Sequence, residues 1–312
     1  MATEGPLDFR EFMAAALYHP ERGYYARGSG QVGRRGDFFT SVSVGPVFGE
    51  LLARRFLAWW LAAGRPAPWR IIECGAHDGT LARDVLRELR RLAPEAIGVL
   101  DYAICETLPR LQAAHLGETV GSPRGSDPCL AAVAEVLEPL GAGYPDGCRT
   151  EVRTDPQWRA LLAPLLAGLQ RGLMVWIDYG FAAPDYYHPA RVDGTLRAFS
   201  RHRIQTDPLE DPGAADLTAH VEFTGFARAA NALGAVPCTF RPQGAWLADL
   251  ARPRLEEMEG TPDPQWIRQF QTLVHPAHLG TRFQVIECAW RECPSPVMPP
   301  ADRHRLAWNG TA

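Results

Sequence analysis

The chain has 312 residues, of which 46% are hydrophobic and 22% charged, and its formal net charge is −4 at neutral pH. A chain of this size and composition can bury a substantial core without disulfides or structural metal ions. A charge so close to zero excludes recruitment of nucleic acid by a global positive field, so we expect no nucleic-acid partner.

The first 64 residues are predicted to form a helical region that a glycine-rich loop interrupts. Asp8 can cap a helix over residues 9–17, with Glu11 as the reciprocal partner of a capping box. The helical spacing of apolar side chains predicts a second helix over residues 46–62. The loop between the two helices has glycines at positions 23, 28, 30, 33 and 36.

An α/β unit follows and decides the predicted fold class. Apolar runs predict strands over residues 69–74 and 99–106, with an amphipathic helix over residues 80–92 between them. This order is the βαβ pattern of doubly wound sheets, whose connection is right-handed. A continuous apolar run at residues 173–178 suits a further buried parallel strand. We therefore predict an α/β protein whose core covers residues 65–180.

The rest of the chain is predicted to form an added region, residues 181–292, and a tail, residues 293–312. The added region begins as loops and continues with helices and late strands. The expected helices cover residues 224–233, 243–250 and 264–273, and the expected strands cover residues 236–240 and 282–289. Because the tail is rich in proline and polar side chains, we expect it to be flexible.

The first functional motif places Glu73 at the end of a strand, followed by Gly75 and Gly79 before a helix. Glycine permits a sharp turn and the close approach of a ligand, and the helix start offers free N–H groups. A nicotinamide site would bind a pyrophosphate through GxGxxG, but the acid at the strand end favours a cationic or polar ligand. S-adenosylmethionine (SAM) fits, because it carries an ammonium group and a positive sulfur. A plain strand-to-helix turn is the alternative.

Two further acids are predicted at the carboxyl ends of strands, where ligands bind in open α/β sheets. Glu106 follows the second strand, at a position suited to ribose hydroxyls. Asp178, followed by Tyr179, ends a later strand and would lie at the same rim as Glu73. Each acid could instead be an ordinary residue that terminates a strand.

The segment Gly36-Asp37-Phe-Phe-Thr40-Ser41 precedes the second predicted helix. It could cap that helix or wrap around a ligand, and capping is the simpler physical interpretation.

A polar cluster between the late strands contains His202, His220 and Glu222 together with several arginines. Histidine and acid side chains can bind metal ions, but the spacing of these three matches no zinc pattern. We therefore expect a polar site without a metal.

Taken together, these segments resemble the MidA-like family of SAM-dependent methyltransferases, which includes the mitochondrial complex I assembly-factor arginine methyltransferase. The resemblance covers residues 8–290. It implies a Rossmann-like methyltransferase core with N-terminal helices and an added substrate region. The matching segments are Tyr18-His-Pro20-Glu-Arg-Gly23-Tyr24-Tyr25, Gly36-Asp37-Phe-Phe-Thr40-Ser41, Phe48-Gly49-Glu50, Glu73-x-Gly75-x-x-x-Gly79-Thr80-Leu81, Asp178-Tyr179-Gly180, Gly194-Thr195-Leu196, Arg201-His202-Arg203 and Asp216-Leu-Thr218-Ala-His220-Val.

The resemblance implies SAM as cofactor and assigns roles to individual residues. The cofactor would be lined by Gly36, Asp37, Thr40 and Ser41 from the N-terminal loop, by Glu73, Gly75 and Gly79 beneath the methionine part, and by Glu106 at the ribose. Asp178 and Tyr179 would face the acceptor. The candidates for orienting an arginine guanidinium and taking up its proton are Asp178, His220 and Glu222.

The chain departs from the family pattern in three places. His77 replaces the middle glycine of the turn, and Glu222 replaces an aspartate. The third departure is a missing segment, Asn-Glu-Leu-Leu-Asp-Ala-Leu-Pro, between the second strand and residue 173. In this superfamily that segment ends a central strand. Strands 69–74 and 173–178 must therefore pair directly or have another strand between them, because unpaired buried backbone costs ~1–3 kcal/mol per group.

These features predict an enzyme, a SAM-dependent methyltransferase that modifies arginine on a protein, with a respiratory complex subunit as one candidate substrate. The alternative is a catalytically impaired relative that binds SAM or a partner protein as an assembly factor. The seven cysteines are odd in number and form no CxxC, and the N-terminus has no apolar signal segment. We therefore expect a cytoplasmic protein that does not enter a membrane.

Overall fold

The computed structural model describes residues 9–26, 39–105, 150–152, 155–200, 203–205, 207–291 and 297–309. Its N-terminal helices are α1 (Phe9–Tyr18) and α2 (Val47–Ala62), and a short 3-10 helix, η1 (Ser41–Val44), precedes α2. Both α-helices lie where the sequence predicts them, the first from its capping residues and the second from its apolar spacing.

The predicted strand–helix–strand unit is confirmed. It consists of β1 (Trp69–Cys74), α3 (Thr80–Leu92), the short α4 (Pro94–Ile97) and β2 (Leu100–Cys105). The two strands are parallel, from Trp69 opposite Leu100 to Cys74 opposite Cys105. Val85 and Leu89 are fully buried, because positions four apart fall on one face of α3.

A second sheet has four strands in the order β7-β3-β9-β8. The strands are β3 (Gly172–Phe181), β7 (Val221–Glu222), β8 (Ala235–Pro242) and β9 (Phe283–Trp290). The apolar run at residues 173–178 does form a strand. Its long neighbour β9 is antiparallel, however, and among the described strands the short β7 alone pairs with it in parallel, at Gly180 and Phe181.

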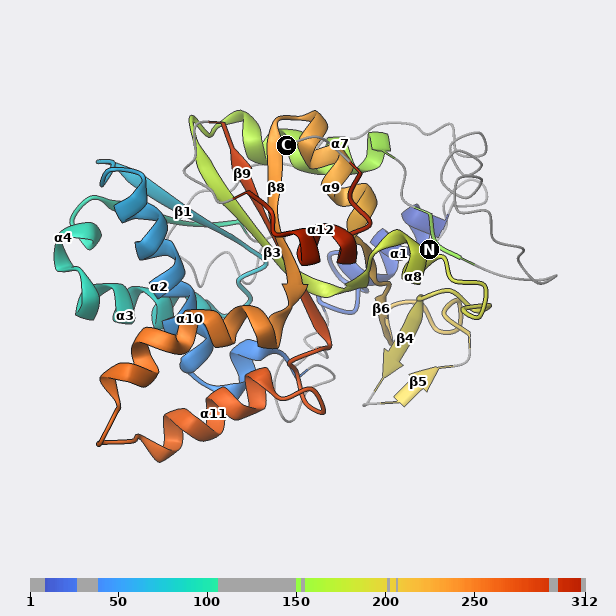
Figure 1. Ribbon diagram of the computed structural model, residues 1–312. Coiled ribbons are helices and arrows are strands. Elements are labelled where there is room, and N and C mark those ends of the chain that lie inside the picture. The colour runs from blue at the N-terminus through green and yellow to red at the C-terminus, as the bar shows by residue number, and fades with distance from the viewer. Residues whose placement is uncertain are drawn as a thin grey trace.

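Helices cover both faces of this second sheet, because side chains of β3 and β9 alternate between two cores. Val175, Ile177 and Val285 face the core formed with α2, α3, α10 (Gln243–Glu257) and α11 (Pro264–Val274). Trp176 and Ile286 face the core formed with α7 (Asp155–Ala167) and α9 (Phe223–Ala232). The result is the three-layer α/β architecture visible in Figure 1.

The two sheets are not joined by a strand within the described part of the chain. β1 pairs with β2 alone, and no described strand pairs with its other edge. Ile72 on β1 is accordingly 42% exposed. Neither direct pairing of β1 with β3 nor a described strand between them is present. The segment that lacks the Asn-Glu-Leu-Leu-Asp-Ala-Leu-Pro motif, residues 106–149, lies outside the described residues.

A small third sheet and α1 form a separate cluster (Figure 1). The sheet has the order β5-β4-β6 and follows the short helix α8. Leu17 of α1 and Leu217 of β6 are buried together, and the Tyr25 hydroxyl donates a hydrogen bond of 2.9 Å to the Asp216 carboxylate. The bounds are α8 (Ala183–Tyr186), β4 (Arg197–Ser200), β5 (Arg203–Gln205) and β6 (Asp216–Thr218).

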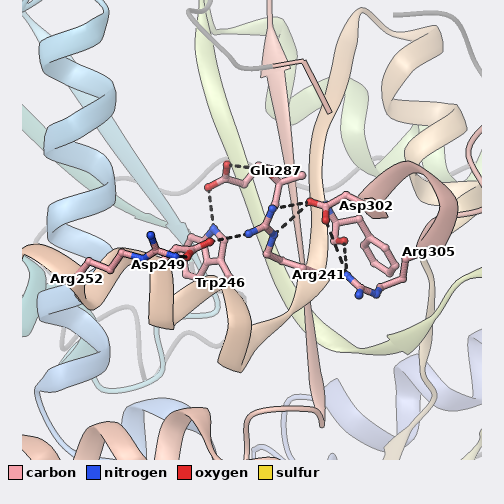
Figure 2. A network of polar contacts seen from close by, with 9 residues as sticks. Arg241, Trp246, Asp249, Arg252, Glu287, Asp302 and Arg305 are labelled. Atoms are coloured by element: carbon pink, nitrogen blue, oxygen red, sulfur yellow. Dashed lines mark hydrogen bonds and ion pairs between the residues drawn. The ribbon is translucent and has the colours of Figure 1, made fainter. Parts of the chain in front are cut away.

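The tail differs from the flexible segment that its composition suggested. Residues 297–309 contain α12 (Pro300–Arg305), and Leu306 is fully buried. Figure 2 shows Asp302 of α12 bound by Arg241 of β8, with Arg305 close by. A buried ion pair and apolar packing therefore hold this part of the tail against the sheet. No helix among the described residues is long and apolar enough to cross a bilayer.

Candidate active site

The turn after β1 contains three residues in the left-handed region of backbone space. Gly75 has φ +72°, His77 φ +50° and Gly79 φ +73°. Glycine adopts such angles without strain, which explains its presence at positions 75 and 79. The turn begins with a hydrogen bond of 2.9 Å from the Gly75 N–H to the Cys105 carbonyl, and α3 begins directly after it.

Gly75 has free space beside it in the described part of the chain. Apart from its chain neighbours, no described heavy atom lies within 4 Å of a Cβ built on Gly75. The described residues therefore leave room for a ligand to approach the backbone beyond the end of β1. This is the feature of the structure that best fits a bound cofactor.

Glu73 places a carboxylate beside this open space. Its Oε2 accepts a hydrogen bond of 2.7 Å from the Tyr102 hydroxyl of β2. Burial raises the pKa of Glu73, while the hydrogen bond from Tyr102 lowers it. No other hydrogen bond or ion pair to this carboxylate is seen within the described ranges, so it can bind a cationic group of a ligand.

His77 occupies the position where the resembling family has glycine. Its φ of +50° is the backbone geometry that glycine provides at no cost, and histidine is among the side chains that tolerate it best. The side chain is 40% exposed, and its Nδ1 lies 3.9 Å from Asp78 Oδ1. Asp78 Oδ1 also accepts a hydrogen bond of 3.0 Å from the Thr80 N–H at the start of α3.

The N-terminal segment has a partly structural role. Thr40 precedes η1, and its hydroxyl lies 3.2 Å from the Ser43 hydroxyl. The buried Ser41 hydroxyl donates a hydrogen bond of 2.8 Å to Gln243 of α10. Ser41 therefore holds η1 against α10. The other predicted cofactor residues, Gly36, Asp37 and Glu106, lie outside the described residues.

The acceptor side is built at the end of β3. Asp178 Oδ1 accepts a hydrogen bond of 2.8 Å from the Tyr179 N–H. The Tyr179 ring stacks on His220 at 6.3 Å between ring centroids and lies 4.1 Å from Phe283. Phe181, which lies on β3 like Tyr179, also contacts His220, with 5.1 Å between the ring centroids. Asp178 lies near the end of β3, and His220 packs against the rings of Tyr179 and Phe181 from that strand. Because side chains alternate along a strand, Asp178 and these two rings start on opposite faces of β3.

His220 is an electrically neutral base in this setting. Its Nδ1 is buried and has no hydrogen-bond partner among the described residues. Burial lowers its pKa, and the positive charges of Arg191 and Arg197 lower it further, while Glu151 acts in the opposite direction. The nitrogen can therefore accept a hydrogen bond or a proton from a bound acceptor.

Glu222 lies two residues from His220, but its carboxylate points into α9. It is 3% exposed and accepts hydrogen bonds of 2.7 Å from the Thr224 N–H and 2.8 Å from the Gly225 N–H. These are the contacts of an N-cap. The catalytic role predicted for Glu222 stays a prediction, and the observed contacts favour a structural one.

Glu151 is a residue for which the sequence alone predicts no role. Its carboxylate accepts hydrogen bonds from Thr195 and Leu196, in the turn that precedes β4. No periodicity or local motif links residues more than forty positions apart, so only the folded chain reveals this contact. Within the described residues, no cluster of three or more His, Cys, Asp or Glu side chains could hold a metal ion.

Comparisons with known proteins agree with this geometry. The model of a family of S-adenosyl-L-methionine-dependent methyltransferases, methyltransferase family 28, matches residues 51–119 and 115–240. The chain is 28% identical to the mitochondrial protein arginine methyltransferase NDUFAF7 homolog of Drosophila melanogaster, over 91% of this chain and 82% of that protein. It is also 28% identical to mitochondrial NDUFAF7 of Rattus norvegicus, over 90% of this chain and 80% of that protein.

Two solved structures share the fold over most of their length. One is a candidate methyltransferase from Burkholderia thailandensis bound to S-adenosyl-homocysteine, with a TM-score of 0.74, 28% identity, and coverage of 93% of this chain and 89% of that one. The other, from the same organism, has a TM-score of 0.66 at 23% identity, with the same coverage of both chains. The second supports the fold alone.

Proposed function

Since the chain belongs to the SAM-dependent methyltransferases of methyltransferase family 28, we propose that its methyl acceptor is the guanidinium group of an arginine in a protein. The names of the curated relatives support an arginine acceptor. The observation that carries the proposal is the buried His220 Nδ1, which has no hydrogen-bond partner among the described residues and belongs to a ring held by Tyr179 and Phe181 of β3. A neutral base and a carboxylate are the two groups that a protonated guanidinium requires.

The cofactor side of the site is formed by the turn after β1. SAM, when bound, supplies a methyl group carried on a positively charged sulfur. Glu73 binds the positive charge of this ligand, and the hydrogen bond from Tyr102 favours the ionised carboxylate against the burial that raises its pKa. Gly75 leaves space for the ligand, since apart from its chain neighbours no described atom lies within 4 Å of its Cβ position.

The acceptor side must orient a cation and remove a proton. A guanidinium is protonated in water, so a nitrogen that gains a methyl group has to release a proton. We assign the orienting role to the Asp178 carboxylate, whose Oδ1 accepts a hydrogen bond from the Tyr179 N–H near the end of β3. The proton passes to His220 Nδ1. The rings of Tyr179 and Phe181 exclude water around His220.

A second candidate function is the alternative that the sequence leaves open. In it the protein binds SAM without transferring its methyl group and acts as an assembly factor that binds a partner protein. In either case we propose a protein partner and a cytoplasmic location.

The test is a methylation assay with methyl-tritiated SAM. The acceptors are two peptide libraries of matched sequence, one with arginine and one with lysine at the central position, and products are identified by acid hydrolysis. We expect methylarginine only, and we expect Glu73→Gln and Asp178→Asn to abolish it. Asp101→Asn, an exposed acid on β2 paired with Arg70, is the matched control and should leave it unchanged.

Three outcomes separate the candidate functions. Methylarginine formation that is lost in Glu73→Gln supports the proposal. Methyllysine instead of methylarginine refutes the arginine acceptor. Tight SAM binding by calorimetry without transfer to either library supports the assembly factor. The chain itself contains no lysine, so any label that it incorporates cannot be methyllysine of the enzyme.

A further inference from the structure

Glu151 anchors a turn that lies far from it in sequence. Its Oε2 accepts hydrogen bonds of 2.8 Å from the Thr195 N–H and 2.9 Å from the Thr195 hydroxyl. Its Oε1 accepts a hydrogen bond of 2.9 Å from the Leu196 N–H. Hydrogen bonds to an ionised carboxylate are roughly twice as strong as neutral ones, so three of them fix the turn firmly.

Gly194 shows that the turn is built around this carboxylate. Its φ is +59°, and a Cβ at this position would lie 2.5 Å from Glu151 Oε1. Both the backbone angle and the close approach require glycine. This contact explains why the segment Gly194-Thr195-Leu196, which the sequence marks only through a family resemblance, begins with glycine.

The Thr195 hydroxyl transmits the position of Glu151 to His220. It donates to the Glu151 carboxylate and accepts a hydrogen bond of 3.1 Å from the His220 N–H. The Tyr186 hydroxyl lies 3.3 Å from the Thr195 hydroxyl oxygen. Thr195 is 2% exposed, so water does not compete for these contacts. The backbone of His220 is thereby tied to Glu151 through a single hydroxyl.

The ring of His220 is held from the other side by aromatic contacts with Phe181 and Tyr179. With its backbone fixed by Thr195 and its ring packed on β3, the imidazole has little freedom. The groups that carry charge around it are Arg191, which lies 4.3 Å over the Phe181 ring, Arg197, whose Nη1 donates to the Leu196 carbonyl, and Glu151. Glu151 is therefore both the anchor of His220 and the negative charge that opposes the two arginines.

We propose that Glu151 is a positioning residue for methyl transfer, which acts through the Thr195 hydroxyl to fix His220 at the acceptor side of the site. This inference rests on the proposed function, because His220 is taken as the group that faces the acceptor. The competing explanation is that Glu151 only stabilises the turn before β4.

The first experiment separates these explanations with variants of Thr195 in the full chain. Thr195→Val removes the hydroxyl at nearly constant shape, and Thr195→Ser restores it. We expect Thr195→Val to lower kcat by about tenfold or more, since misplacing a reactive group by about 1 Å can cost 10²-fold. The KM for SAM should stay unchanged, and Thr195→Ser should recover most of the rate.

The matched control is Thr239→Val, which removes another buried hydroxyl that donates to a carboxylate, that of Glu287, at 3.4 Å. Thr239 lies on β8, away from His220. If Thr195→Val lowers kcat only by reducing stability, its kcat should fall as much as that of Thr239→Val. Equal kcat losses in Thr195→Val and Thr239→Val, or no recovery in Thr195→Ser, would overturn the proposal.

The second experiment needs no acceptor. Histidine-selective ¹⁵N labelling follows the titration of His220, identified by the signal that His220→Gln removes. Because Glu151 opposes the arginines, Glu151→Gln should lower the pKa of His220 further. In the methylation assay, the fall in rate on the acid side should then move to lower pH.

The two experiments also distinguish failure of this inference from failure of the proposed function. If no peptide is methylated but Glu151→Gln shifts the His220 titration as expected, the coupling stands and the arginine acceptor is refuted. If methylation occurs and the His220 titration is the same in wild type and Glu151→Gln, the role of Glu151 is refuted while the proposed function stands.

Discussion

The Tyr102 hydroxyl of β2 donates a hydrogen bond of 2.7 Å to the Glu73 carboxylate at the end of the neighbouring strand β1. Glu73 lies opposite Ile104 in the parallel pair, so the tyrosine reaches it diagonally across the strands. Burial alone would favour the neutral acid, and this hydrogen bond favours the charged form. Tyr102 therefore controls how strongly Glu73 attracts a cationic ligand.

Tyr102→Phe should weaken SAM binding roughly fivefold at neutral pH, which corresponds to the ~1 kcal/mol of a typical hydrogen bond. The carboxylate is the form that binds, so affinity falls as the pH drops through the raised pKa of Glu73. Without the hydroxyl this pKa rises further, and the loss of affinity should begin at a higher pH. Titration calorimetry with SAM at several pH values measures both effects.

Tyr25→Phe is the control for that experiment, because its hydroxyl also donates to a carboxylate, that of Asp216, at 2.9 Å. It lies outside the turn after β1, so SAM affinity should follow the wild type at every pH. A pH profile of Tyr102→Phe that overlays the profile of Tyr25→Phe would remove Glu73 from the cofactor site.

Gly75→Ala should separate backbone strain from blockage of the cofactor. At φ +72° an alanine costs roughly 1–2 kcal/mol of stability. Gly260, in the turn after α10, has φ +79° and likewise no atom within 4 Å of a Cβ position. Gly260→Ala should therefore lose similar stability in urea unfolding but no SAM affinity, whereas Gly75→Ala should lose at least tenfold in affinity by calorimetry. Equal affinity of the two variants would show that no ligand occupies the space beside Gly75.

The elements that the sequence predicts well are those with strong local signals. The β1–α3–β2 unit lies at the expected residues, because apolar periodicity and the glycines at 75 and 79 act within a few positions of each other. The same local information places Glu73 near the end of β1, just before the turn. The helical N-terminal region and the late strands β8 and β9 follow from the same kind of pattern.

What the sequence does not predict depends on contacts between distant segments. The antiparallel pairing of β3 with β9 joins residues more than a hundred positions apart, and an apolar run carries no information on the direction of its neighbour. The capping role of Glu222 and the contact of Glu151 with Thr195 arise from tertiary packing. The proline content of the tail predicts a flexible segment. The residue that holds the tail, the buried Asp302, is a single position that composition does not reveal.

His77→Gly tests whether the histidine obstructs the turn. Glycine relieves the left-handed angle at residue 77 but adds freedom to the unfolded chain, so the two effects nearly cancel and stability should change by less than about 0.5 kcal/mol. Because the ring is partly exposed beside Asp78, SAM affinity should stay within about twofold of the wild type.

The informative control for His77 is alanine, which removes the ring but keeps the Cβ at φ +50°. Calorimetry should find both variants close to the wild type. If glycine and alanine each tighten SAM binding by about tenfold or more, the ring occupies the cofactor site and the turn has a different role from the one proposed.

Glu222→Ala should destabilise the protein without affecting the chemistry. Loss of an N-cap costs about 1–2 kcal/mol of stability. Because Glu222 is buried, the N–H groups that it leaves unpaired add to this loss. Asp263→Ala is the matched variant, since Asp263 caps α11 through the Gln265 and Trp266 N–H groups. Turnover per folded molecule, measured beside urea unfolding, should be the same for both. A selective loss of turnover in Glu222→Ala would restore the catalytic role that the sequence suggested.

Asp302 should contribute more to stability than any exposed acid of the same network. Its Oδ2 accepts hydrogen bonds from Arg241 Nη2 at 3.0 Å and from the Phe240 N–H at 3.2 Å (Figure 2). Asp302→Asn leaves the Arg241 guanidinium and a buried N–H poorly paired, and we expect a loss of about 3 kcal/mol in urea unfolding.

Asp249→Asn provides the comparison, because Asp249 binds the same Arg241 side chain at 2.8 Å from the exposed side. An exposed ion pair contributes less than about 1 kcal/mol. Both variants should bind SAM as the wild type does, since the network lies at β8, α10 and α12 rather than at the turn after β1. If the two substitutions cost the same, α12 is not held by its buried carboxylate, and its attachment must come from Leu306 and the surrounding apolar contacts alone.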